Sequence, residues 1–153
     1  MNIRLDNLEG AEICTLLQRH LDEVAKHSPP EGVHALDLAG LQMPEISFWT
    51  LWQDESLLGC GALKELDTRH GEIKSMHTHS NARGMGVAKT MLNHIMTTAR
   101  QRGYERLSLE TGSMAAFVPA RKLYEKHGFV ECPVFGDYKV DVHSVFMTKA
   151  LSP

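Results

Sequence analysis

The segment Arg83-Gly84-Met85-Gly86-Val87-Ala88 decides the fold and function that we predict. It lies between a predicted strand, 72–79, and an amphipathic stretch, 87–102, whose apolar residues recur at helical spacing. Glycine tolerates positive φ and lets a ligand approach the backbone closely. The free N–H groups and the dipole at a helix start favour an anion, and Arg83 and Lys89 add positive charge. The pattern therefore favours a loop that binds phosphate.

Two established phosphate motifs do not fit this segment. A dinucleotide fingerprint needs glycine where Lys89 stands, and a P-loop needs glycine where Ala88 stands. What is left is R-x-x-G-x-A, formed by Arg83, Gly86 and Ala88. A tight turn that merely packs a helix on a strand is the structural alternative. The loop by itself leaves the ligand open.

Outward from the loop, the rest of the chain alternates strand-like and helix-like segments. We read these as an α/β arrangement, a mixed sheet with helices on its faces, in a single domain spanning 1–153. Predicted strands cover 2–5, 47–53, 57–66, 72–79, 106–110, 129–134 and 142–149, with 67–71 as a turn; predicted helices cover 11–26, 33–41, 87–102 and 115–127. In strand 72–79, period-2 alternation places Glu72, Lys74 and Met76 on one face.

Composition narrows the class of protein. The chain has 153 residues, a formal net charge of −3 and 42% hydrophobic residues, which fits a globular domain and argues against a general nucleic-acid binder. Its three cysteines form no C-x-x-C pair, which argues against a disulfide framework or a zinc ribbon. We see no signal peptide and no apolar run of about 18 residues. We therefore expect a cytoplasmic protein with no membrane and no nucleic-acid partner.

A second motif identifies a family. Residues 120–129 read A-R-K-L-Y-E-K-H-G-F, which is similar to the A-x-x-L-Y-x-x-x-G-F signature. With R-x-x-G-x-A before it and one predicted strand between, the chain resembles the GNAT (Gcn5-related) N-acetyltransferases over about 2–151. A branch of small bacterial members is further resembled in Leu109-Glu110-Thr111-Gly112, Phe117, Cys132-Pro133 and Tyr138. The resemblance implies a GNAT fold, with a mostly antiparallel sheet whose central strands splay. It also implies acetyl-CoA as acetyl donor and direct attack by a primary amine in a ternary complex.

The resemblance further implies which residues bind the cofactor. The main-chain groups of Met76, His77 and Thr78 would pair with the pantetheine arm. Phe117 stands where many members have an asparagine, so we expect an apolar contact with the arm there. The pyrophosphate would lie on Arg83, Gly84, Met85, Gly86, Val87, Ala88 and Lys89.

The catalytic residues follow from the same resemblance. Tyr124 matches the family tyrosine near the acyl sulfur; a phenol with a pKa of about 10 can protonate a leaving thiolate. Glu72 resembles the glutamate that draws the amine proton through water, and Glu110 is its rival. The alternatives are a half-buried packing role for Tyr124 and a solvated strand-end carboxylate for Glu72.

The acceptor is not identified by the sequence. We take it to be a small-molecule or peptide amine and predict that His34, Trp52, Glu110 and Tyr138 contact it. His77 and His79 form H-x-H, but no further ligands accompany them, so we predict no metal. A homodimer is possible. Two other readings stay open: a CoA-binding regulatory module without turnover, and a nucleotide-binding α/β protein that uses the same loop.

Overall fold

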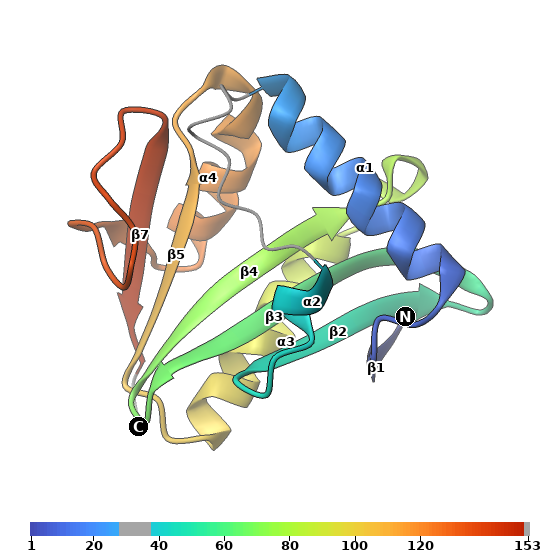
Figure 1. The fold of residues 1–153 in the computed structure, drawn as a ribbon, viewed down its shortest axis with the longest axis horizontal. Coiled ribbons are helices and arrows are strands. Elements are labelled where there is room, and N and C mark those ends of the chain that lie inside the picture. Colours follow the sequence, from blue (N-terminus) through green and yellow to red (C-terminus); the bar gives the residue numbers. More distant parts are fainter. Residues whose placement is uncertain (28–37, 152–153) are drawn as a thin grey trace.

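The computed structural model describes residues 1–27 and 38–151, and its strands form one seven-stranded sheet in the order β1-β2-β3-β4-β5-β7-β6 (Figure 1). All neighbouring strands are antiparallel except β4 and β5, which are parallel. The strands are β1 (Asn2–Leu5), β2 (Ile46–Gln53), β3 (Ser56–Asp67), β4 (His70–Thr78), β5 (Arg106–Gly112), β6 (Val130–Glu131) and β7 (Ser144–Ala150). The helices are α1 (Ala11–His27), α2 (Leu38–Leu41), α3 (Val87–Gln101) and α4 (Val118–Lys126), with short 3-10 helices η2 (Ser80–Ala82) and η3 (Ala115–Phe117).

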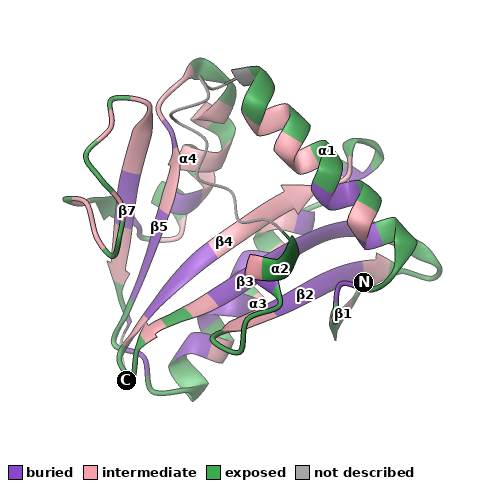
Figure 2. Cartoon of the chain, in the orientation of Figure 1, coloured by how far each residue is buried: buried purple, intermediate pink, exposed green. Residues whose placement is uncertain are grey.

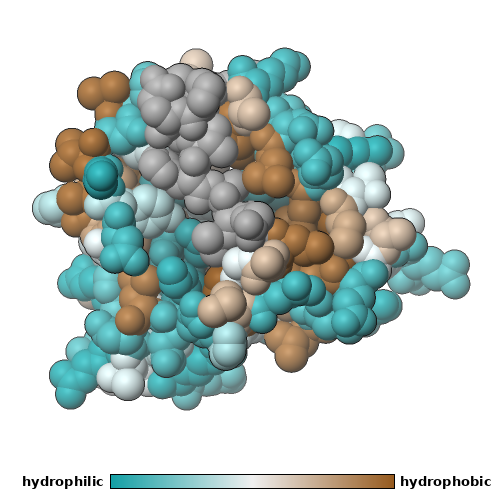
Figure 3. All heavy atoms as spheres, viewed as in Figure 1, coloured by the Kyte–Doolittle hydropathy of each residue, from teal (hydrophilic) through white to brown (hydrophobic). Residues whose placement is uncertain are grey.

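Helices cover both faces of the sheet, as we predicted (Figure 1). On one face α3 and α4 bury the larger apolar cluster, which includes Leu92, Ile95 and Leu107 at 0% exposure. On the other face α1 packs Ile13 and Leu16 against β2 and β3. The central strands are therefore the most buried part of the sheet (Figure 2). Hydrophobic residues still reach the surface between α1 and α2 (Figure 3).

The parallel pair β4 and β5 separates partway along its length. The two strands pair only from His70 with Arg106 to Ile73 with Leu109. Beyond this point β4 continues to Thr78 beside β3, whereas β5 continues to Gly112 beside β7 (Figure 1). We call Lys74–Thr78 and Glu110–Gly112, the stretches over which β4 and β5 no longer pair with each other, the β4–β5 fork. The fork confirms the splayed central strands that the family resemblance implied.

A β-bulge interrupts β4 inside the fork. Ser75 has φ of +55°, and the register with β3 shifts between Cys60 and Ala62. The buried Cys60 thiol donates a hydrogen bond to the Ser75 carbonyl oxygen over 3.2 Å, which holds the bulge. The simple alternation predicted for β4 is therefore wrong beyond Lys74. Met76 packs with the α3 cluster, whereas His77 turns to the α1 face.

The other differences from the predicted elements are local. The turn before β4 contains only residues 68–69, because β3 and β4 extend into the predicted turn 67–71. Strand β6 is shorter than predicted, since Pro133 has no N–H to continue its pairing with β7. The predicted helix 115–127 divides into η3 and α4, with Pro119 in the first turn of α4. Of the predicted helix 33–41, only α2 lies among the described residues.

Among the described residues, no helix is long and apolar enough to span a membrane.

Candidate active site

The glycine loop opens directly into α3. Gly84 and Gly86 have φ of +81° and +79°, a conformation that favours glycine, and Gly86 is the N-cap of α3. A Cβ atom at either glycine would meet no protein atom within 4 Å. Positive φ and open space together leave the loop backbone accessible to a ligand. Arg83 and Lys89 are exposed beside it.

The apolar residues of the loop have different environments. Met85 is 44% exposed, whereas Val87 is 2% exposed. The Val87 side chain packs on β3, where its Cγ1 lies 2.7 Å from a Cβ built on Gly59. Ala88 is half-buried. Val87 can therefore contact a bound molecule only through its backbone.

The far end of β4 leads from the fork to the loop. Thr78 pairs with Gly59 of β3, and the ring of His77 faces α1, where the Nδ1 atoms of His20 and His77 lie 3.2 Å apart. Burial lowers the pKa of each imidazole to about 4. At His77 the positive charge of Arg83 adds to this effect, behind burial and His20. Both rings are therefore neutral at neutral pH.

Tyr124 lies on α4 behind the fork. Its side chain is 7% exposed and its ring packs edge-on against Phe129 at 5.9 Å between centroids. Burial, and then the charge of Glu110, raise the pKa of the Tyr124 hydroxyl to about 12. The phenol is therefore protonated at neutral pH.

Glu110 lies on the β5 side of the fork. Its Oε2 accepts a hydrogen bond of 2.6 Å from the Ser144 hydroxyl of β7. Its carboxylate contributes to the raised pKa of both Tyr124 and Tyr138. The Glu110 charge therefore acts on the two tyrosines that the sequence singled out.

Glu72 lies just below the fork and is 3% exposed. Its Oε2 accepts hydrogen bonds from Tyr138 Oη at 2.6 Å and from Lys74 Nζ at 3.0 Å. Lys74 Nζ also donates to Tyr138 Oη over 2.8 Å, which closes a three-membered network. Burial, and then Glu72, strongly raise the pKa of Tyr138. The alternative of a solvated strand-end carboxylate is therefore wrong for Glu72.

Tyr138 belongs to an aromatic group on this face of the sheet. Its ring, Phe135 and Phe146 contact one another with centroids 5.5–5.7 Å apart. Beside them, Glu72, Lys74 and Asp137 line a pocket of about 640 Å³. The segment before β7 is thus fixed to the sheet by packing and by the bonded Tyr138 hydroxyl.

The remaining predicted residues have different positions. Phe117 of η3 packs over Gly112 and leaves no room for a Cβ there, so its ring lies at the end of the fork. Trp52 does not reach the fork: it pairs with Asn2 near the sheet edge, and Arg4 stacks over its ring at 4.9 Å. His34 lies outside the described residues. In residues 1–27 and 38–151, no three His, Cys, Asp or Glu side chains gather as metal ligands.

Sequence reasoning missed three features of the site. It gave no role to Lys74, although its alternation with Glu72 indicated a shared face. It also missed Ser144 as the donor to Glu110, and the bulge that Cys60 and Ser75 form. Strand pairing joins Cys60 to Ser75 over 15 positions and Glu110 to Ser144 over 34 positions, so no local signal could identify these two contacts.

Comparison with known proteins agrees with these features. Residues 12–129 match the family model described as the acetyltransferase (GNAT) family. The chain is 58% identical to the uncharacterized N-acetyltransferase YsnE of Bacillus subtilis (strain 168) over 151 residues, covering 99% of this chain and 100% of YsnE. It is 45% identical to the uncharacterized N-acetyltransferase YedL of Escherichia coli (strain K12), covering 97% and 94% of the two chains.

Solved structures show the same fold. The crystal structure of a protein from Klebsiella pneumoniae superposes on this chain with a TM-score of 0.80 and 26% identity, covering 99% of this chain and 97% of that one. A GNAT family acetyltransferase from Elizabethkingia anophelis, crystallised with acetyl-CoA bound, has a TM-score of 0.68 and 15% identity, covering 98% of this chain and 97% of that one. The chain belongs to the GNAT family of acetyltransferases and is therefore an N-acyltransferase.

Proposed function

We propose that the protein binds acetyl-CoA in the β4–β5 fork and transfers the acetyl group to a primary amine by direct attack. The observation that carries this proposal is the loop of left-handed glycines, open to solvent, between the fork and α3. The diphosphate of coenzyme A lies on the loop N–H groups, at the positive end of α3. Arg83 and Lys89 add charge to this contact.

The pantetheine arm of the cofactor binds in the fork. Where β4 and β5 separate, the two strands no longer pair with each other as they do between His70 and Ile73. A pantetheine arm carries amides that can form hydrogen bonds with the backbone of a strand, as a neighbouring strand does. Residues 76–78 bind it through the main chain, and Phe117 borders the other side of the fork.

Tyr124 is the general acid. The tetrahedral intermediate expels a thiolate, whose conjugate acid has a pKa near 8.5. The Tyr124 hydroxyl stays protonated up to its raised pKa of about 12, so it holds a proton for the thiolate throughout the physiological range. Removal of this hydroxyl lowers kcat more than it raises KM.

Glu72 and Glu110 are both candidates for the base that removes the proton of the acceptor ammonium, and we assign this role to Glu110. Glu72 Oε2 already accepts from Lys74 and Tyr138, and the side chain is 3% exposed. Glu110 is half-buried on the wall of the fork and influences both Tyr124 and Tyr138. Glu72 then fixes the Tyr138 hydroxyl, and the aromatic group holds the acceptor side of the site in place.

The test of cofactor binding uses two glycines in the same backbone conformation. Gly86 and Gly103 have φ of +79° and +82°, and a Cβ at either meets no protein atom within 4 Å. Valine at either position therefore costs a similar backbone strain, about 1–2 kcal/mol or more. We expect Gly86→Val to lose acetyl-CoA binding in calorimetry, because its side chain blocks the diphosphate, whereas Gly103→Val binds normally.

Far-ultraviolet circular dichroism establishes that both variants fold, and Gly86→Ala provides a milder second variant. Undiminished acetyl-CoA affinity in folded Gly86→Val and Gly86→Ala would contradict the loop assignment. The acceptor is then sought by measuring acetyl-CoA-dependent thiol release with a panel of amines. A wild-type protein that binds acetyl-CoA but releases no thiol with any amine would favour the regulatory reading.

A further inference from the structure

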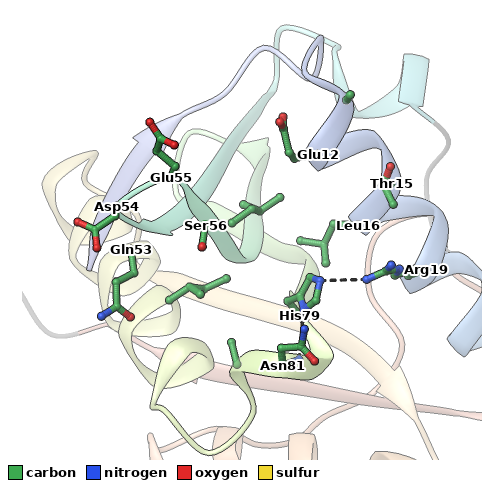
Figure 4. A pocket seen from close by; sticks show the side chains of 14 residues that line it. Glu12, Thr15, Leu16, Arg19, Gln53, Asp54, Glu55, Ser56, His79 and Asn81 are labelled. Carbon is green, nitrogen blue, oxygen red and sulfur yellow. Dashed lines mark hydrogen bonds between the residues drawn. The ribbon is translucent and has the colours of Figure 1, made fainter.

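A second pocket lies away from the fork, between α1, the β2–β3 turn and the connection from β4 to α3 (Figure 4). Its volume is about 780 Å³. Its floor is apolar and buried, with Leu16 at 2%, Leu58 at 8% and Ala82 at 1% exposure. Polar side chains surround this floor. A concave apolar floor with a few polar groups is the common form of a small-molecule site.

One wall of this pocket has more hydrogen-bond donors than acceptors. His79 Nδ1 accepts the backbone N–H of Asn81 at 3.1 Å, and His79 Nε2 lies 2.9 Å from Arg19 Nη1 (Figure 4). A neutral imidazole has only one acceptor nitrogen. Either the Asn81 N–H or the Arg19 guanidinium therefore faces an N–H of the ring. A negatively charged oxygen beside Arg19 and His79 would accept from both side chains and remove the conflict.

The rim opposite this wall carries negative charge. Glu12 on α1 and Asp54 and Glu55 on the β2–β3 turn line the pocket, and Figure 4 shows them away from His79. These carboxylates disfavour a purely anionic ligand and attract a positive group. We propose that this pocket binds a small zwitterion with an apolar body, of the amino-acid class. Its carboxylate lies on Arg19 and His79, its ammonium lies toward the acidic rim, and its side chain lies on the floor.

The pocket is separate from the proposed acetyl-transfer site. Its lining comes from α1, the end of β2, the β2–β3 turn, β3 and residues 79–82, and includes none of the residues of β5, α4 or the glycine loop 83–86. The ligand of this pocket is thus neither the acetyl donor nor the attacking amine.

Calorimetry on the full chain without acetyl-CoA tests the proposal, with L-phenylalanine as the probe. Two analogues each lack one charge: 3-phenylpropanoate lacks the ammonium, and 2-phenylethylamine lacks the carboxylate. We expect L-phenylalanine to bind more tightly than either analogue. Arg19→Gln should weaken the binding of L-phenylalanine about tenfold, because it removes a charge-assisted hydrogen bond. It should leave the affinity for 2-phenylethylamine unchanged. Arg19→Lys should lose less affinity for L-phenylalanine than Arg19→Gln does.

Arg4→Gln is the matched control, because Arg4 is an exposed cation that stacks on Trp52 outside this pocket. It should bind L-phenylalanine as the wild type does. The proposal is wrong if wild type does not bind L-phenylalanine, or if Arg19→Gln binds it equally well. Competition between L-phenylalanine and acetyl-CoA, or acetylation of L-phenylalanine that Arg19→Gln abolishes, would also overturn it, since either places the ligand in the transfer site.

Discussion

At the scale of single residues, the two carboxylates of the site differ in what surrounds them. Glu72 is enclosed and accepts from Lys74 and Tyr138, whereas Glu110 is half-buried and accepts from Ser144. A base must reach the proton that it removes, directly or through one water. Contact geometry therefore favours Glu110 for this role, although the family resemblance pointed to Glu72.

This assignment predicts different kinetics for the two amide variants. We expect Glu110→Gln to lower kcat by about 10²–10⁴-fold and to remove the acidic limb of the pH–rate profile. Glu72→Gln leaves that limb in place and mainly raises KM for the amine, because it loosens Tyr138. The pH dependence of kcat and kcat/KM for each variant provides the measurement. If Glu72→Gln alone loses the acidic limb, Glu72 is the base.

At the scale of elements, the contact between α1 and β4 depends on two neutral imidazoles. His20 and His77 each have a pKa lowered from 6.5 to about 4, chiefly by burial. The charged and titratable groups near His77 are Arg83, Glu23 and His79, and Arg19 contacts His79. Between pH 6.5 and 4 the unfolded chain binds protons that the folded chain does not. The free energy of unfolding therefore falls as pH decreases through this window.

We expect His20→Asn to flatten this pH dependence. The substitution removes one of the two titrating rings and the mutual repulsion of the pair. For half-buried His20 the effect is on the order of 2–3 kcal/mol between pH 7 and pH 4. Urea unfolding across this range measures it. A slope of stability against pH that is equal in wild type and His20→Asn would show that the pair does not govern acid sensitivity.

At the scale of the whole molecule, the fork separates two halves of the sheet. Strands β1 to β4 lie on one side and β5, β7 and β6 on the other, joined by only four residue pairs between β4 and β5. A ligand that pairs with both edges of the fork thus joins the halves. Binding to the folded state alone raises its stability through mass action.

Acetyl-CoA should therefore stabilise the protein against unfolding. At a free concentration of 100 times its Kd, the expected gain is about 2.7 kcal/mol. Neither ATP nor NAD should give a comparable rise in melting temperature, because neither carries a pantetheine arm to fill the fork. Thermal unfolding with each ligand makes the comparison. Stabilisation by ATP or NAD and not by acetyl-CoA would contradict the proposed cofactor.

The sequence by itself determined the family, the approximate helices and strands, and the glycine loop, because these depend on local spacing. Each of the two motifs lies within a short stretch of sequence. One is Gly86 before the apolar stripe of α3, and the other is the A-x-x-L-Y pattern that Gly128-Phe129 follows. Only the tertiary structure decided the contacts of Glu72 with Tyr138 and of Glu110 with Ser144, since folding joins residues that lie 66 and 34 positions apart in the sequence. It also decided the faces of β4, because the Ser75 bulge depends on Cys60 of the neighbouring strand.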